Sequence, residues 1–159
     1  MTTSVKPIPE GYHTVSPYLV IKNAAAAIEF YKRAFGAKET GRMPGPDGRI
    51  MHAEIQIGDS KVMICDEMPE YNARSPQTLG GTPVSLFLYV PDVDASFQQA
   101  VAAGARSTMP VADMFWGDRF GKLADPFGHE WSIATHKEDL THEEIERRGR
   151  EAMSKSAGA

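Results

Sequence analysis

Apolar residues recur along the chain in two series of the same form. Each series has an apolar run, then apolar residues at helical spacing, then alternating apolar and polar residues. This pattern predicts a strand, a helix and three further strands. The first series predicts strands over 15–21, 37–43, 50–57 and 62–66 and a helix over 24–35. The second series predicts strands over 84–90, 105–111, 115–123 and 130–135 and a helix from Asp92 or Asp94 to about Ala103.

The spacing of turn residues indicates that the second series repeats the first. Gly36-Ala37 recurs as Gly104-Ala105, 68 residues later. The repeat predicts an α+β fold of two tandem βαβββ units, over 14–66 and 83–135. One such sheet buries little by itself, so we expect the two sheets to form a curved mixed sheet around a cavity. The expected divisions of the chain are an extended arm over 1–13, one domain over 14–136 and a charged C-terminal helix over 138–153.

Composition narrows the class of protein. The chain has 159 residues, of which 42% are hydrophobic and 24% charged, as in a globular domain rather than a disordered or collagen-like chain. A net charge of −4 does not favour nucleic-acid binding, which needs clustered cations. The single cysteine, Cys65, excludes an intrachain disulfide. Because neither a signal peptide nor a membrane span of roughly 20 apolar residues is visible, we expect a cytoplasmic protein without a membrane partner.

Five segments of the chain carry a resemblance to a known family. They are YLVIKNAAAAIEFYKRAFGA (18–37), DGRIMHAEIQIGDS (47–60), GGTPVSLFLYVPDVDASFQQAVAAGA (80–105), FWGDRFGKLADPFGHEWSIATH (115–136) and EDLTHEEIERR (138–148). On these segments the chain resembles the vicinal-oxygen-chelate superfamily of glyoxalase I, bleomycin-resistance proteins and extradiol dioxygenases, and within it the PhnB-like branch. The resemblance implies a glyoxalase-like fold and a homodimer. It leaves the reaction open, because this superfamily contains lyases, isomerases, dioxygenases and drug-binding proteins.

The resemblance also bears on metal binding. Members that use a metal place its ligands, typically His and Glu, on the strands that line the cavity. Carried over to this sequence, three of these positions fall near Ser16, Ser85 and Ser132, and the fourth falls within 62–64. A serine hydroxyl is a poor ligand for Zn²⁺, Ni²⁺ or Fe²⁺. The resemblance therefore implies that this chain holds no metal and no other cofactor, with a divalent metal on shifted ligands as the alternative.

Two groups of polar residues are candidates for chemistry. The imidazole of His52 can act as a general base or a ligand anchor beside Glu54, although His52 can equally be an ordinary histidine of a sheet face. Trp116 can stack on a ligand, and Arg119 can bind an anion with two parallel hydrogen bonds. The alternative for this second group is a structural pair between Asp118 and Arg119.

Because side chains alternate between the two faces of a strand, further residues are predicted to line the cavity. If Ser16, Ser85 and Ser132 face the cavity, residues two positions away from them face it as well. His52 and Arg119, on corresponding strands of the two units, are expected to border the same cavity. The predicted catalytic residues are His52, Glu54 and Asp118, and the predicted ligand contacts are Tyr18, Phe87, Tyr89, Trp116 and Arg119.

Three functions stay open at this point. The chain can be an enzyme that acts on a small organic substrate without the usual metal, a protein that sequesters a drug or metabolite, or a metal-dependent lyase or dioxygenase with shifted ligands. The serines argue against the third function but do not separate the first two. The working hypothesis is therefore a protein that binds a small organic ligand in a cavity, with its reaction undetermined.

Overall fold

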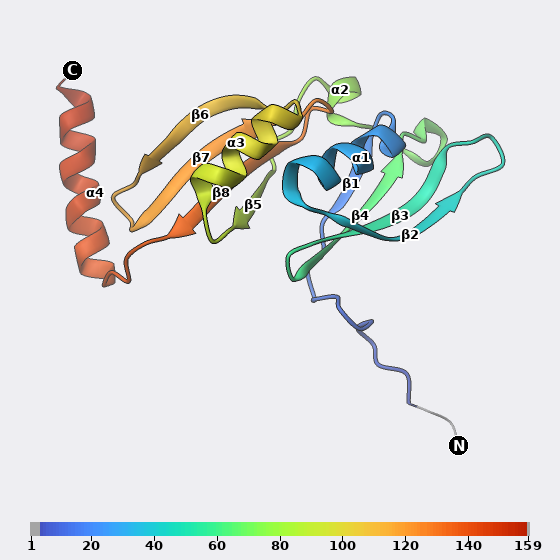
Figure 1. Cartoon of the computed structure of the whole chain (residues 1–159), viewed down its shortest axis with the longest axis horizontal. Helices are drawn as coiled ribbons and strands as arrows, with labels where there is room; N and C mark the ends of the chain where they lie inside the picture. Colours follow the sequence, from blue (N-terminus) through green and yellow to red (C-terminus); the bar gives the residue numbers. More distant parts are fainter. Residues whose placement is uncertain (1–3, 159) are drawn as a thin grey trace. The chain divides into compact units, whose positions relative to one another are not determined.

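A computed structural model describes residues 4–158, which divide into two compact units (Figure 1). Unit 1 ends at Thr82 and unit 2 begins at Pro83. Each unit contains one four-stranded mixed sheet and one long helix that packs against it. The predicted α+β fold of two βαβββ units with a C-terminal helix is confirmed.

Unit 1 follows the predicted order of elements. Its elements are β1 (Tyr18–Ile21), α1 (Ala24–Phe35), β2 (Lys38–Pro44), β3 (Ile50–Ile57) and β4 (Ser60–Asp66). The strands are adjacent in the order β1-β4-β3-β2, with β1 parallel to β4 and the other pairs antiparallel. Helix α1 begins after Asn23, whose side chain accepts a hydrogen bond from the amide of Ala26. It ends at Gly36 in the left-handed conformation that glycine adopts at low cost.

Unit 2 repeats this arrangement. Its elements are β5 (Ser85–Tyr89), α3 (Val93–Ala103), β6 (Arg106–Asp113), β7 (Asp118–Ala124), β8 (Glu130–His136) and the C-terminal α4 (His142–Ala157). The strand order is β5-β8-β7-β6, again with only the first pair parallel among the described strands. The carboxylate of Asp92 accepts a hydrogen bond from the amide of Ala95, so Asp92 rather than Asp94 caps α3. Thr141 caps α4 in the same way.

The helix of each unit covers one face of its sheet, and we call the other face the open face. In unit 1, Ala53 and Ile55 of β3 are fully buried, and the alternating residues His52 and Glu54 lie on the open face. In unit 2, Gly121 of β7 faces α3. A Cβ atom at Gly121 would lie only 2.8 Å from the ring of Phe97, which is part of α3. The neighbouring positions on β7 therefore belong to the open face.

Two segments differ from the expectation. Strand β7 begins at Asp118, three residues later than predicted, because Met114 and Gly117 form a tight turn. In this turn the amide of Gly117 donates to the carbonyl of Met114, and the amide of Met114 donates to the carbonyl of Asp118. The joining loop also contains two short helices, the 3₁₀ turn η1 (Pro69–Tyr71) and α2 (Pro76–Leu79).

None of the described helices is long and apolar enough to span a bilayer. The cytoplasmic location stays a prediction from the sequence.

Candidate functional site

Four aromatic side chains gather on the open face of unit 2. We call Phe87, Tyr89, Trp116 and Phe120 the aromatic platform. The ring centroids of Phe87 and Tyr89 are 4.9 Å apart, those of Phe87 and Phe120 are 5.6 Å apart, and those of Trp116 and Phe120 are 5.5 Å apart. Phe87 is 46% exposed and Tyr89 is 65% exposed, whereas Phe120 is only 5% exposed. The platform therefore offers two accessible rings, and one of them, Phe87, stacks on the buried Phe120.

A buried carboxylate holds two of these rings in place. Asp118 is only 3% exposed, and its Oδ2 accepts hydrogen bonds from the Tyr89 hydroxyl at 3.0 Å and from the Trp116 indole nitrogen at 3.1 Å. The hydrogen bond to Asp118 raises the pKa of Tyr89, so this phenol remains a donor at neutral pH. Asp118 thus fixes the orientation of both side chains.

His136 connects Asp118 to the segment that follows β8. Its Nδ1 lies 2.8 Å from Oδ1 of Asp118, and its Nε2 lies 2.8 Å from Oδ1 of Asp139. The hydrogen bonds to Asp118 and then to Asp139 raise the pKa of His136, because both carboxylates favour the protonated ring. His136 is not among the site residues that the sequence predicts. The signal was present in the antiparallel pairing of β7 and β8, which places Asp118 opposite His136.

A second polar group lies on the open face of unit 1. The Tyr18 hydroxyl is 3.3 Å from Nδ1 of His52, and Oε1 of Glu54 is 3.6 Å from Nε2. Glu54 also accepts a hydrogen bond from the Tyr12 hydroxyl, which lowers the pKa of Glu54. Burial and the bond to Glu54 together raise the pKa of Tyr12 to about 12. An ionised Glu54 beside His52 can support proton transfer, and the catalytic role of both residues stays a prediction.

The predicted site residues thus form two groups, one on each unit. Unit 1 brings together His52, Glu54 and Tyr18, and unit 2 brings together Asp118 with three predicted ligand contacts, Phe87, Tyr89 and Trp116.

Arg119 lies apart from the platform, on the face of its sheet that α3 covers. Its guanidinium binds both carboxylate oxygens of Asp94, at 2.8 and 2.9 Å, and Asp113 at 3.2 Å. It lines a separate cavity of about 280 Å³ together with Asp94, Thr135 and Lys137. A contact between Arg119 and a ligand stays a prediction.

The pairing registers explain the position of Arg119. Met63 pairs with Tyr18 and Glu54, and Ser132 pairs with Phe87 and Lys122. Lys122 therefore occupies the position on β7 that Glu54 occupies on β3 of the other unit. Two residues earlier along each strand, Phe120 of β7 corresponds to His52 of β3 in the same way. Arg119 is one residue out of phase with this match. A shift of one residue along a strand reverses the face that a side chain occupies.

The residues at the family's metal-ligand positions do not fit a transition metal. The hydroxyls of Ser85 and Ser132 lie 3.1 Å apart and hydrogen-bond to each other, and the hydroxyl of Ser16 donates to the carbonyl of His13. Within residues 4–158, no group of three His, Cys, Asp or Glu side chains could hold a metal ion. Hydroxyls are weak ligands for such ions, so we derive no chemical step through a metal.

Comparisons with known proteins agree with this fold. A family profile described as Glyoxalase/Bleomycin resistance protein/Dioxygenase superfamily matches residues 12–133. The chain is 47% identical over 135 residues to the uncharacterized protein Rv0887c of Mycobacterium tuberculosis, a match that covers 83% of this chain and 79% of that protein. The crystal structure of TioX from Micromonospora sp. ML1 is 30% identical, with a TM-score of 0.64 over 78% of this chain and 98% of that chain.

A PhnB protein from Bacillus cereus supports the same fold. It is 18% identical, with a TM-score of 0.60 over 77% of this chain and 99% of that chain. At this identity the likeness concerns the fold alone. The resemblance seen in the sequence is confirmed: the chain belongs to the glyoxalase/bleomycin resistance protein/dioxygenase superfamily.

Proposed function

We propose that this protein binds small, planar aromatic molecules on the open face of unit 2. The observation that carries the proposal is the buried carboxylate of Asp118, which holds the exposed Tyr89 in place together with Trp116. Burial of a charge is costly, and here it fixes aromatic side chains that leave much apolar surface in water. Such a fixed surface favours a ligand that can stack on it, because little side-chain freedom is lost on binding.

The accessible ring of Phe87 gives the most direct test. Isothermal titration calorimetry with 2-naphthamide, an uncharged planar probe, is expected to show binding to the full chain. Phe87→Ala is expected to weaken this binding about tenfold, because stacking on Phe87 is lost. Tyr71→Ala is the matched control, since Tyr71 is 72% exposed and lies on η1 of unit 1. Absence of binding, or equal losses in both variants, would contradict the proposal.

Catalysis by His52, Glu54 and Asp118 stays a prediction, and so does the sequestration of a drug or metabolite.

We further propose that the chain forms a homodimer in solution. Besides the resemblance, apolar side chains support this proposal: Met153 of α4 is 68% exposed and Met43 of β2 is 57% exposed. Sedimentation equilibrium of the full chain is expected to give twice the chain mass of 17.4 kDa. A chain that ends after Leu140 lacks α4 but keeps the bond between His136 and Asp139, and we expect it to dissociate more readily. A monomeric full chain would contradict the dimer.

A further inference from the structure

The open face of unit 2 also carries a cation beside the aromatic platform. Lys122 lies two residues after Phe120 on β7, and its Nζ is 6.0 Å from the centroid of the Phe120 ring. On the neighbouring strand β8, Lys122 pairs with Ser132, which pairs in turn with Phe87 of β5. The ammonium group therefore lies at the edge of the platform.

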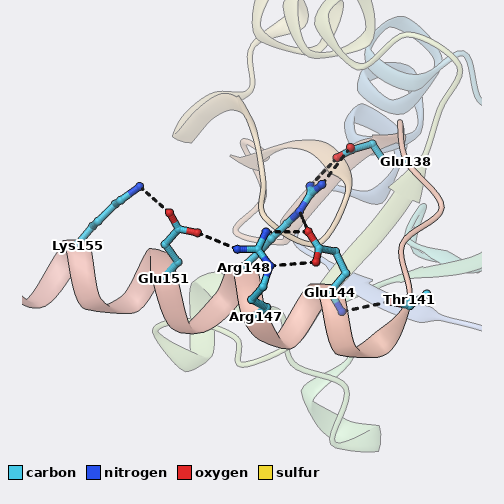
Figure 2. Close-up of polar contacts among 7 residues, drawn as sticks. All are labelled: Glu138, Thr141, Glu144, Arg147, Arg148, Glu151 and Lys155. Carbon is cyan, nitrogen blue, oxygen red and sulfur yellow. Dashed lines mark hydrogen bonds and ion pairs between the residues drawn. The ribbon is translucent and has the colours of Figure 1, made fainter.

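The charge of Lys122 is not neutralised by a neighbouring carboxylate. Among the described residues, no Asp or Glu oxygen forms an ion pair with its Nζ. Three arginines of unit 2 are paired: Arg119 binds Asp94, and Figure 2 shows Arg147 and Arg148 of α4 bound to glutamates of the same unit. Lys122 is thus a cation that can bind a ligand without breaking an existing ion pair.

Two serines add hydrogen-bonding capacity beside Lys122. The hydroxyls of Ser85 and Ser132 bond to each other at 3.1 Å, and one of the two hydroxyl hydrogens is left for a further acceptor. Asp118, which holds two rings of the platform, already accepts hydrogen bonds on both of its carboxylate oxygens. Glu130 also lies on this face, directly opposite Ser85 and two residues before Ser132, and among the described residues no ion pair joins it to Lys122. The group next to the rings therefore combines a cation with a hydroxyl donor.

The two units carry opposite charges at one corresponding position of their sheets. The position that matches Lys122 in unit 1 is Glu54, whose carboxylate is bound by Tyr12 and lies near His52. The two open faces therefore carry opposite charges at equivalent positions of their sheets. An anion is favoured beside Lys122 and disfavoured beside Glu54.

We propose that the site on unit 2 selects planar aromatic anions, such as aromatic carboxylates. The aromatic ring stacks on Phe87 and Tyr89, and the anionic group binds Lys122 and the serine pair. This inference rests on the proposed binding of aromatic molecules and adds the charge of the ligand to it.

Three probes of one shape and different charge test the inference: 2-naphthoate, 2-naphthamide and 2-naphthylmethylammonium. Calorimetry in buffer of low ionic strength is expected to show that 2-naphthoate binds about threefold to fivefold more tightly than 2-naphthamide, as for a partly exposed ion pair. The preference is expected to shrink in about 0.5 M sodium chloride, because salt screens the pair. The ammonium probe is expected to bind the most weakly.

Variants of two lysines test whether Lys122 causes the preference for 2-naphthoate over 2-naphthamide. Lys122→Gln is expected to bind 2-naphthoate and 2-naphthamide equally, and Lys122→Arg is expected to keep the preference. Lys155→Gln is the matched control, because it removes the same charge from α4, where Lys155 is paired with Glu151 (Figure 2). This control is expected to behave as the unchanged chain does.

The outcomes separate the two proposals. If the chain binds 2-naphthamide but shows no preference for 2-naphthoate, or prefers the ammonium probe, the inference on charge is wrong and the proposed function stands. A preference that survives in Lys122→Gln also overturns the role of Lys122. If the chain binds none of the three probes, the proposed function itself fails.

Discussion

Replacement of Asp118 by alanine is expected to lower the free energy of unfolding by about 2 to 3 kcal/mol. The carboxylate is 3% exposed and accepts hydrogen bonds from Tyr89, Trp116 and His136. Its removal leaves the partly buried indole N–H of Trp116 without its acceptor and creates a space at the start of β7. Urea denaturation followed by circular dichroism measures this change.

Asp139→Asn is the matched control for Asp118→Ala. Asp139 binds the other ring nitrogen of His136, but its side chain is fully exposed, so its replacement is expected to change the stability little. The two variants are also expected to differ in ligand binding. Asp118→Ala is expected to weaken the binding of 2-naphthamide about tenfold, because Tyr89 and Trp116 lose their fixed orientation. Equal stability of the two variants would contradict the role of Asp118 as the anchor of the platform.

The fold could be predicted from the sequence because its signals are local. Asn23 and Gly36 mark the two ends of α1, and the alternation within β3 separates the buried Ala53 and Ile55 from His52 and Glu54. Each of these features depends on residues that are neighbours along one element. The repetition of the same signals in unit 2 then establishes the second sheet.

The site could be predicted only in part, because it depends on pairing between strands. The sequence predicts Asp118 and Trp116 from their chemistry and Tyr89 from the alternation along its strand, but nothing local shows that one carboxylate binds both rings. Lys122 and His136 were not selected, since their places follow from the registers of β7 and β8. Without these registers the face of Arg119 could not be assigned either, because a shift of one residue reverses it.

The turn before β7 shows how an irregular segment positions this site. Gly117 separates Trp116 from Asp118 and has a φ of +101°, a conformation that other residues rarely adopt. Its carbonyl accepts hydrogen bonds from the amides of Lys137 and Glu138, which follow β8. Through these bonds the turn is attached to the segment that carries His136 and Asp139.

Gly117→Ala is therefore expected to lower the free energy of unfolding by about 3 kcal/mol or more. A Cβ atom at this position would lie 2.7 Å from the carbonyl oxygen of Glu138, and a backbone atom cannot move aside as a flexible side chain can. The cost has two parts, the positive φ, at about 1 kcal/mol, and the displacement of the backbone. Urea denaturation measures their sum.

Gly48→Ala measures the cost of a positive φ without the cost of displacing the backbone. Gly48 has a φ of +85°, but nothing lies within 4 Å of a Cβ atom there, so only the conformational cost of about 1 kcal/mol is expected. The difference between the two variants reports the contact with Glu138. Because displacement of the turn moves Trp116 relative to Asp118, Gly117→Ala is also expected to change the tryptophan emission of the folded chain and to weaken the binding of 2-naphthamide. If both variants lose the same stability and bind the probe equally, the turn does not hold the platform in place.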